Sequence, residues 1–285
     1  METTSFESYF KKRNPNYVFL ISRMRTAMEV SKVTFDDITT TNLTKVKDYL
    51  LDDPNTSNSS VKTYMAVIKS TCNVLAVDGM VRPINMRMVG NIKADKTENV
   101  ALTEQEVKLF VDYYNRLYTQ PNNQCTKDVL TLFLIELFTG ARSCDCENFK
   151  REDIDDGILS YVSQKNHTLT HVPVHSMLPK LLNRIPKKEY SRTTKCRVIK
   201  RTAEKLGITQ KEKRNYHGVL KYRPRYEYLG THSARRTFVT LLVDKNVPIA
   251  TVSKMCGHAD VNMTYRYYRP NKIEICNEAM SFFNA

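Results

Sequence analysis

Two histidines, an arginine and a group of tyrosines lie close together in the last third of this 285-residue chain. They belong to the segments His232-Ser233-Ala234-Arg235, Gly257-His258 and Tyr265-Arg266-Tyr267-Tyr268. A tyrosine phenolate can attack phosphorus, an arginine can neutralise the non-bridging oxygens, and a histidine can accept the phenolic proton. These residue types therefore suffice to break a phosphodiester bond and hold it covalently, without a metal ion or another cofactor.

The spacing of these residues resembles that of the tyrosine recombinases, the phage integrase family. Members carry His-x-x-Arg near the start of a helix, a later Gly-His pair, and a nucleophilic tyrosine nine residues after that second histidine. They also carry an arginine shortly after Thr-Gly at the end of an apolar helix, and a β-hairpin lysine shortly before Val-Pro. This chain fills all six positions with Arg142, Lys165, His232, Arg235, His258 and Tyr267.

The resemblance implies a role for each of these residues. Arg142 and Arg235 are expected to bind the attacked phosphate, because planar bidentate donors fit its developing negative charge. His232 lies three residues before Arg235, so both side chains can reach the same phosphate from one helical face. His232 is the candidate proton acceptor for Tyr267, whereas His258 is expected to hydrogen-bond the phosphate.

Lys165 is the candidate general acid for the departing 5′ oxygen, since an alkoxide is a poor leaving group. An ordinary exposed loop lysine is the alternative, and Lys150 and Lys180 are other candidates for the same role. Arg236 is the alternative to Arg235. Asp145 follows the first arginine where the family often has a glutamate, and it is either an orienting group or a helix-surface carboxylate.

Three neighbouring tyrosines compete for the role of nucleophile. The spacing from Gly257-His258 selects Tyr267 over Tyr265 and Tyr268. A slip of one residue around a helix rotates a side chain by about 100°. Any of the three tyrosines is also compatible with a simple packing role.

The composition agrees with a polyanionic partner. The chain has 44 Lys and Arg against 30 Asp and Glu, a formal net charge of +14, which favours phosphate contacts. Its seven cysteines include no paired CxxC arrangement, and Cys144-x-Cys146 is a poor metal site, so we expect reduced thiols and no bound metal. No apolar run is long enough to span a bilayer and no signal peptide is evident, so we expect a cytoplasmic protein.

The resemblance implies a mainly α fold with a small β-sheet, in which a helical, SAM-like core-binding domain precedes a mixed α/β catalytic domain. The expected parts are a core-type DNA-binding domain (1–90), a linker (91–100), a catalytic domain (101–270) and a C-terminal helix (271–285). This helix is expected to pack on a neighbouring protomer, and packing back on its own subunit is the alternative. Thr103 and Glu106 have the spacing of a capping box, which predicts a helix start near the beginning of the catalytic domain.

Hydrophobic patterns predict the elements that position the candidate residues. An apolar helix is expected over 129–138, ending at a glycine stop signal just before Arg142. Two short alternating segments, 158–163 and 171–174, predict strands on either side of Lys165. The basic stretch 187–228 is expected to be irregular, with an inserted hairpin over 223–230.

The resemblance further implies site-specific recombination through a 3′-phosphotyrosine intermediate, with no cofactor. The expected partners are double-stranded DNA with inverted-repeat core sites, three further copies of the chain in a tetramer on DNA, and directionality or host architectural factors. The expected setting is a mobile element resembling those of the Bacteroides group, in a bacterial or phage-infected cell. The alternatives are a type IB topoisomerase, which reseals the original strand, and a non-catalytic DNA-binding module.

Overall fold

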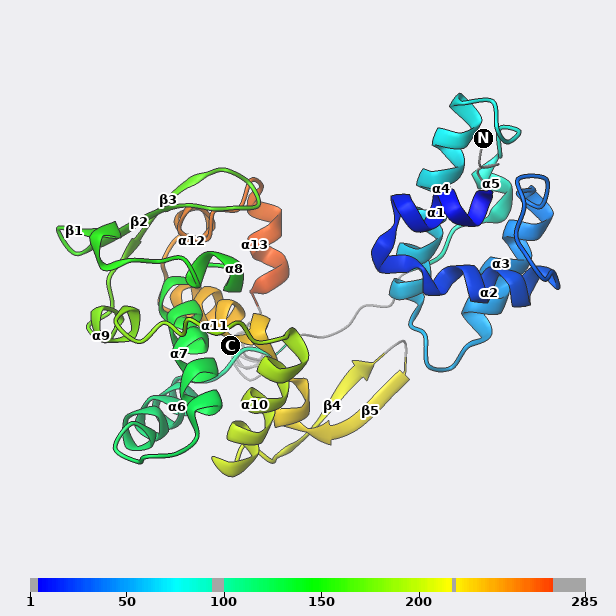
Figure 1. Ribbon diagram of the computed structural model, residues 1–285. Helices are drawn as coiled ribbons and strands as arrows, with labels where there is room; N and C mark the ends of the chain where they lie inside the picture. Colours follow the sequence, from blue (N-terminus) through cyan, green and yellow to red (C-terminus); the bar gives the residue numbers. More distant parts are fainter. Residues whose placement is uncertain (1–4, 94–99, 217–218, 269–285) are drawn as a thin grey trace, which may run out of the picture. The chain divides into compact units, whose positions relative to one another are not determined.

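The structure, a computed structural model, describes residues 5–93, 100–216 and 219–268 (Figure 1). The chain divides into two compact units, one of residues 1–97 with 215–220 and one of residues 98–214 with 221–285. Helices predominate, and the described strands form one three-stranded and one two-stranded sheet. The predicted fold class is therefore confirmed. The helix expected over 271–285 lies outside the described residues. No helix of the described part has the length and apolar character needed to cross a membrane.

The first unit is built from helices around one apolar core. Its helices are α1 (Phe6–Arg13), α2 (Phe19–Met28), α3 (Thr40–Asp52), α4 (Asn58–Val77) and α5 (Met86–Val89). The hydroxyl of Ser57 caps α4 by accepting a hydrogen bond from the backbone N–H of Ser60. Apolar residues of α4 recur at helical spacing and are buried, namely Val61, Met65, Ile68, Cys72 and Leu75. Lys62 and Lys69 of this helix remain exposed.

The second unit is organised around one buried helix. Its helices are α6 (Glu104–Leu117), α7 (Gln124–Thr139), α8 (Ser143–Cys146), α9 (Leu178–Leu182), α10 (Arg192–Lys205), α11 (Thr231–Asp244), α12 (Ile249–Met255) and α13 (Val261–Tyr267). Figure 1 shows α7 in the middle of this unit, with α6, α9 and α11 around it. A helix that is apolar on all sides must be enclosed, and residues 127–137 of α7 are buried throughout. The predicted capping box of Thr103 and Glu106 is confirmed at the start of α6.

A three-stranded antiparallel sheet lies at one edge of this unit. Its strands are β1 (Ile154–Asp155), β2 (Ile158–Val162) and β3 (Leu169–Pro173), in that order across the sheet. Leu159 pairs with Val172 and both are fully buried, whereas Ile158 and Val162 face outward. The two predicted strands are thus confirmed to within two residues, and β1 is an addition to the prediction.

The prediction of an irregular region over 187–228 is wrong. This stretch contains α10 and a hairpin of β4 (Lys211–Tyr216) and β5 (Val219–Pro224), which precedes the predicted position 223–230. The hairpin is polar and shows no apolar alternation, so local sequence did not reveal it. The end of the hairpin next to Arg225 is held by a residue far away in the sequence. The buried Arg225 donates hydrogen bonds to both carboxylate oxygens of Glu106, and it also donates to Glu212.

Candidate active site

The turn after α7 depends on Gly140. Its φ of +63° lies in the left-handed region, which glycine adopts without steric cost. A Cβ atom here would lie 2.3 Å from Cδ1 of Phe238 on α11, so any side chain would collide with that ring. The turn ends α7 and places Arg142 as the residue that caps α8.

Arg235 lies in the first turns of α11 and joins three segments of the catalytic unit. Its Nη1 donates to the Gly140 carbonyl at 2.6 Å, and its Nη2 donates to the Cys256 carbonyl at 2.6 Å. The residue is only 1% exposed, and its Nε is buried without a hydrogen-bond partner. A guanidinium group has five N–H donors. Arg235 is therefore held by two carbonyls, and its buried Nε has no hydrogen-bond partner in the described structure.

His258 is oriented by a threonine on the next helix. Its Nδ1 lies 2.8 Å from Oγ1 of Thr264, and its Nε2 is buried without a partner. Burial, together with the positive charges of Arg235 and Arg142, lowers the pKa of His258 to about 3. The ring is therefore neutral near pH 7. When the Thr264 hydroxyl donates to Nδ1, the proton of the imidazole lies on Nε2, which can then donate to a phosphate oxygen.

Tyr267 lies against both of these groups. Its ring centroid is 5.2 Å from that of His258 with an interplanar angle of 29°, and Cζ of Arg235 lies 5.6 Å from the same ring. Thr264 and Tyr267 are three residues apart on α13, so one helical face presents both to the site. Tyr265, by contrast, is 55% exposed. The structure thus brings Tyr267, Arg235 and His258 together.

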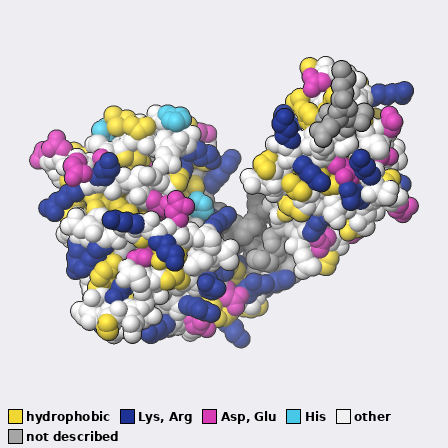
Figure 2. All heavy atoms as spheres, in the orientation of Figure 1, with side chains coloured by type: hydrophobic (Ala, Val, Ile, Leu, Met, Phe, Trp, Pro, Cys, Tyr) yellow, Lys and Arg dark blue, Asp and Glu magenta, His cyan; other side chains and the backbone are white. Residues whose placement is uncertain are grey.

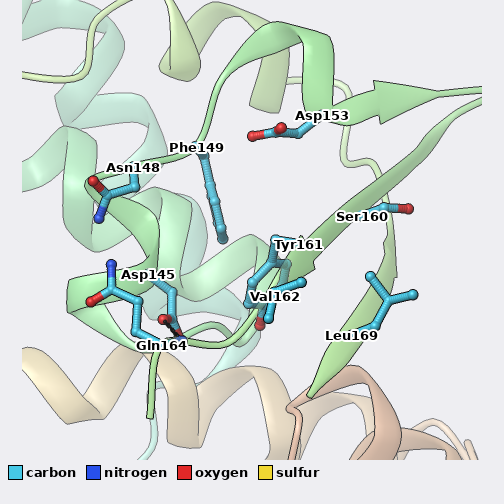
Figure 3. Close-up of a pocket in the computed structure, with 9 residues that line it drawn as sticks. All are labelled: Asp145, Asn148, Phe149, Asp153, Ser160, Tyr161, Val162, Gln164 and Leu169. Carbon is cyan, nitrogen blue, oxygen red and sulfur yellow. Dashed lines mark hydrogen bonds between the residues drawn. The ribbon is translucent and has the colours of Figure 1, made fainter. Parts of the chain in front are cut away.

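Arg142 contacts the turn that connects β2 to β3. Its Nη1 donates to Oγ of Ser163 at 2.6 Å, and Oγ of Ser163 in turn donates to Asp145 at 3.4 Å. The other carboxylate oxygen of Asp145 accepts from the backbone N–H of Gln164 at 2.9 Å. Asp145 is 3% exposed, so the interpretation as a helix-surface carboxylate is wrong. It fixes the start of the turn beside Arg142 (Figure 3).

Lys165 lies in this same turn, and its side chain is exposed to solvent. The residues on either side of it are fixed. Gln164 is bonded to Asp145, and Nδ2 of Asn166 donates to the Gly257 carbonyl at 3.0 Å. The turn is therefore anchored both beside Arg142 and beside His258, and Lys165 is the exposed residue between the two anchors. The alternative lysines, Lys150 and Lys180, are also exposed.

His232 lies in the first turn of α11, at the edge of the site. The residue retains solvent exposure, yet desolvation of its ring lowers its pKa. The positive charges of Arg236, Arg192, Arg235 and Arg142 lower it further. These groups favour the neutral imidazole, which is the form that can accept a proton.

A cavity of about 340 Å³ opens beside Asp145, but it contains none of the six candidate residues. Its lining comes from α8, the segment after it and the sheet (Figure 3): Asp145, Asn148, Phe149, Asp153, Ser160, Tyr161, Val162, Gln164 and Leu169. The described residues include no cluster of three His, Cys, Asp or Glu side chains suited to a metal ion. Arg235 and His258, two of the candidate residues, lie instead next to the ring of Tyr267.

Sequence reasoning missed three supporting side chains. Ser163 holds Arg142, Asn166 fixes the turn, and Thr264 orients His258. Ser163 and Asn166 lie within two residues of Lys165, but no sequence pattern indicates their hydrogen-bond partners in distant segments. The sequence gives a weak indication that Thr264 supports the site, because it precedes Tyr267 by about one helical turn.

Comparison with known proteins shows the family. The sequence matches the family model described as the phage integrase family over residues 84–274, which is more than half of the chain. A probable integrase/recombinase of Acholeplasma phage L2 is 21% identical over 236 residues, covering 80% of this chain and 76% of the phage protein.

Solved structures share the fold. XerH site-specific recombinase bound to palindromic difH substrate matches with a TM-score of 0.67 and 16% identity, covering 95% of this chain and 80% of that chain. A lambda integrase dimer bound to a COC′ core site matches with a TM-score of 0.64 and 17% identity, covering 92% and 90%. The Tn1549 transposon integrase in complex with transposon right end DNA matches with a TM-score of 0.61 and 13% identity, covering 99% and 100%. With its mainly helical catalytic unit and the family match over most of its length, the chain belongs to the phage integrase family and is a tyrosine site-specific DNA recombinase.

Proposed function

We propose that Oη of Tyr267 attacks the phosphorus of one DNA strand. The bond between Oη and phosphorus forms, the bond from phosphorus to the 5′ oxygen breaks, and a 3′-phosphotyrosine results. His232 accepts the phenolic proton, and Lys165 donates a proton to the departing 5′ oxygen. The position of the Tyr267 ring against His258 and Arg235 is the observation that carries this proposal.

The same proposal assigns charge stabilisation to three buried or half-buried groups. Arg142 and Arg235 bind the non-bridging oxygens, and His258 donates a hydrogen bond from Nε2. Two unpartnered buried atoms support this, Nε of Arg235 and Nε2 of His258, because buried polar atoms normally have partners. A bound phosphate oxygen would satisfy them. Donors already fixed before the reaction stabilise developing charge without reorganisation.

Strand exchange follows from the reversibility of this step. The energy of the phosphodiester is retained in the phosphotyrosine, so the 5′ hydroxyl of a partner strand can attack it and restore a phosphodiester. Two such exchanges complete recombination. The reaction balances without ATP, an oxidant or a metal ion.

We propose that the DNA substrate carries inverted-repeat core sites bound by four copies of the chain, in the cytoplasm of a bacterial or phage-infected cell. XerH was solved on a palindromic site, and a lambda integrase tetramer was solved on a Holliday junction with a TM-score of 0.62 to this chain. The charge of +14 suits such a partner. Lys and Arg side chains are spread over the visible face of each unit (Figure 2).

The parts of the chain are proposed to have separate roles. Residues 1–90 would bind the core site, 91–100 would link the domains and 101–270 would carry the chemistry. Directionality or host factors would select the outcome.

The segment 271–285 is proposed to pack on a neighbouring protomer and to link active sites in a ring. A heterologous contact of this kind matters for the assembled tetramer and less for one protomer. Deletion of residues 272–285 should leave binding to one half-site within a few-fold but abolish cooperative occupancy of the full site. Unfolding of the truncated protein, or undiminished cooperativity, would contradict exchange of this segment.

The chemistry is tested with nicked suicide duplexes made from the DNA that flanks the gene. Tyr267→Phe should abolish covalent adducts while noncovalent affinity stays nearly unchanged, because one hydroxyl supplies chemistry and little binding. Tyr268→Phe is the matched control and should still form adducts. Adducts that persist in Tyr267→Phe and vanish in Tyr268→Phe would overturn the assignment. Relaxation of a plasmid without target sites would instead indicate topoisomerase activity.

A further inference from the structure

A buried carboxylate lies behind the phosphate-binding arginines, and the mechanism above does not use it. Glu136 is on α7, one turn before Gly140, and only 2% of it is exposed. Its Oε1 is buried without a hydrogen-bond partner. Most buried polar atoms are paired, so an ionised carboxylate is costly at this position.

A small cavity adjoins Glu136 and suits one water molecule. It has a volume of about 10 Å³, which is close to the space that a single water requires. Its polar lining comes from Glu136, Ser143, Lys195 and Thr231, and its apolar lining from Val129, Leu132, Phe133 and Ile199. A water here would have several polar groups within its surroundings, including the unpartnered carboxylate oxygen.

The charged and titratable groups around Glu136 come from α10, from α11 and from α8 with the residue that follows it. Arg235 and Arg236 approach from α11 and Lys195 from α10, and these three cations favour the ionised carboxylate. Glu147 opposes ionisation, and it forms an ion pair with Lys195. The Cys146 thiol is also close and stays neutral, because burial raises its pKa. Burial outweighs the cations and raises the pKa of Glu136 to about 8.

We propose that Glu136 is a positioning residue whose protonation state controls how strongly Arg235 attracts the DNA phosphate. While it holds a proton, Arg235 directs its full positive charge toward the DNA phosphate. When it loses the proton, the carboxylate competes with the phosphate for Arg235 and weakens both phosphate binding and stabilisation of the attacked state. The inference rests on the proposed role of Arg235.

Linkage makes this relation reciprocal. A phosphate bound at Arg235 adds negative charge near Glu136 and so favours its protonated form, and by the same amount protonation favours the phosphate. The usual carboxyl pKa of Glu136 is 4.5, and its folded value is raised to about 8. Between these values the folded protein holds a proton that the unfolded chain has lost, so the contribution of Glu136 to stability falls as pH rises through this window.

Glu136→Gln tests the inference because glutamine has the shape of the protonated acid and cannot ionise. Adduct rates on the suicide duplex are compared from about pH 6 to about pH 9.5. The rate of Glu136→Gln divided by that of the parent should stay near one below about pH 7 and rise about tenfold above about pH 8. Groups that titrate in both proteins cancel in this ratio. Glu104→Gln, which removes a carboxylate that is 61% exposed, is the matched control and should keep the parent profile.

A second measurement needs neither DNA nor catalysis. In urea unfolding, Glu136→Gln should gain stability relative to the parent as pH rises from about 6 to about 9, whereas Glu104→Gln should not. A rate ratio or a stability difference that does not change with pH would overturn the role of Glu136. If the parent protein forms no adduct, the proposed function fails instead, and the unfolding comparison still decides the protonation of Glu136.

Discussion

The two sides of the active site differ in how far they are fixed before DNA binds. Arg235, His258 and Tyr267 form a packed group in which the arginine is 1% exposed and bonded to two backbone carbonyls. Lys165 lies on an anchored turn, but its side chain is in solvent. The groups proposed to stabilise charge are therefore preorganised, and Lys165, the group proposed to protonate the leaving oxygen, is held only by its backbone.

Electrostatics accounts for this difference. Arginine stays protonated when it is buried, and hydrogen bonds to carbonyl groups offset part of its desolvation. A lysine enclosed near Arg142 and Arg235 without an anion would suffer both desolvation and repulsion, and its pKa would fall. A DNA phosphate supplies the missing anion. In the proposed mechanism Lys165 would therefore enter the site after DNA has bound.

The largest expected effect on cleavage comes from the packed group of Arg235, His258 and Tyr267. Arg235→Lys should lower the rate of adduct formation by at least about 10³-fold, because it removes planar donors from the attacked phosphate and frees the Gly140 and Cys256 carbonyls. Arg236→Lys is the matched control and should cost less than about tenfold. Single-turnover rates on the suicide duplex measure both. A larger defect in Arg236→Lys would transfer the catalytic role to Arg236.

For the exposed Lys165 we predict a defect that depends on the leaving group. Lys165→Ala should slow cleavage of ordinary DNA about 10²-fold, because the 5′ oxygen leaves without a proton. A 5′-bridging phosphorothiolate has a thiolate leaving group that needs no acid, so its cleavage should be restored to within a few-fold of the parent. Equal defects on both substrates would remove Lys165 from this role, and the same substrates would then test Lys150 and Lys180.

The turn that joins α7 to Arg142 predicts an effect on stability. Gly140→Ala should lower the free energy of unfolding by about 2–4 kcal/mol, because alanine is strained at positive φ and its Cβ collides with Phe238. Gly157→Ala is the matched control. Gly157 has a φ of +74° and no atom within 4 Å of the position that a Cβ would take, so strain alone should cost about 1–2 kcal/mol. Urea denaturation compares them, and equal losses would contradict the role of the Phe238 contact.

The smallest effect concerns the hydrogen bond that orients His258. Thr264→Val keeps the side-chain shape but removes the hydroxyl, and a single hydrogen bond is worth about 1 kcal/mol. Cleavage should therefore fall by about fivefold with little change in DNA affinity. Thr264→Ser retains the hydroxyl and should stay near the parent rate. If Thr264→Ser is impaired and Thr264→Val is not, packing of the methyl group matters and the hydrogen bond does not.

Local sequence predicted the features that depend on neighbouring residues. The capping box of Thr103 and Glu106, the glycine that ends α7 and the two strands around Lys165 all follow from short-range patterns. The position of Tyr267 relative to His258 could also be predicted, because both belong to one short helical segment and the loop before it. The catalytic roles of these residues stay predictions that the experiments above address.

Contacts between distant segments could not be predicted in this way. Asn166 and the Gly257 carbonyl are 91 residues apart, and Arg225 and Glu106 are 119 residues apart. The hairpin of β4 and β5 has no apolar alternation, and its base is fixed by that second contact. A glutamate in the middle of an apolar helix is visible in the sequence, but the raised pKa of Glu136 depends on its burial in the folded chain.

Tyr267 is proposed to become covalently linked to DNA beside Arg235 and His258. The most direct test digests the trapped adduct with a protease and a nuclease and identifies the modified residue by mass spectrometry. The remaining nucleotide should be attached to Tyr267 through its 3′ phosphate. Attachment to Tyr265 or Tyr268, or linkage through a 5′ phosphate, would contradict it.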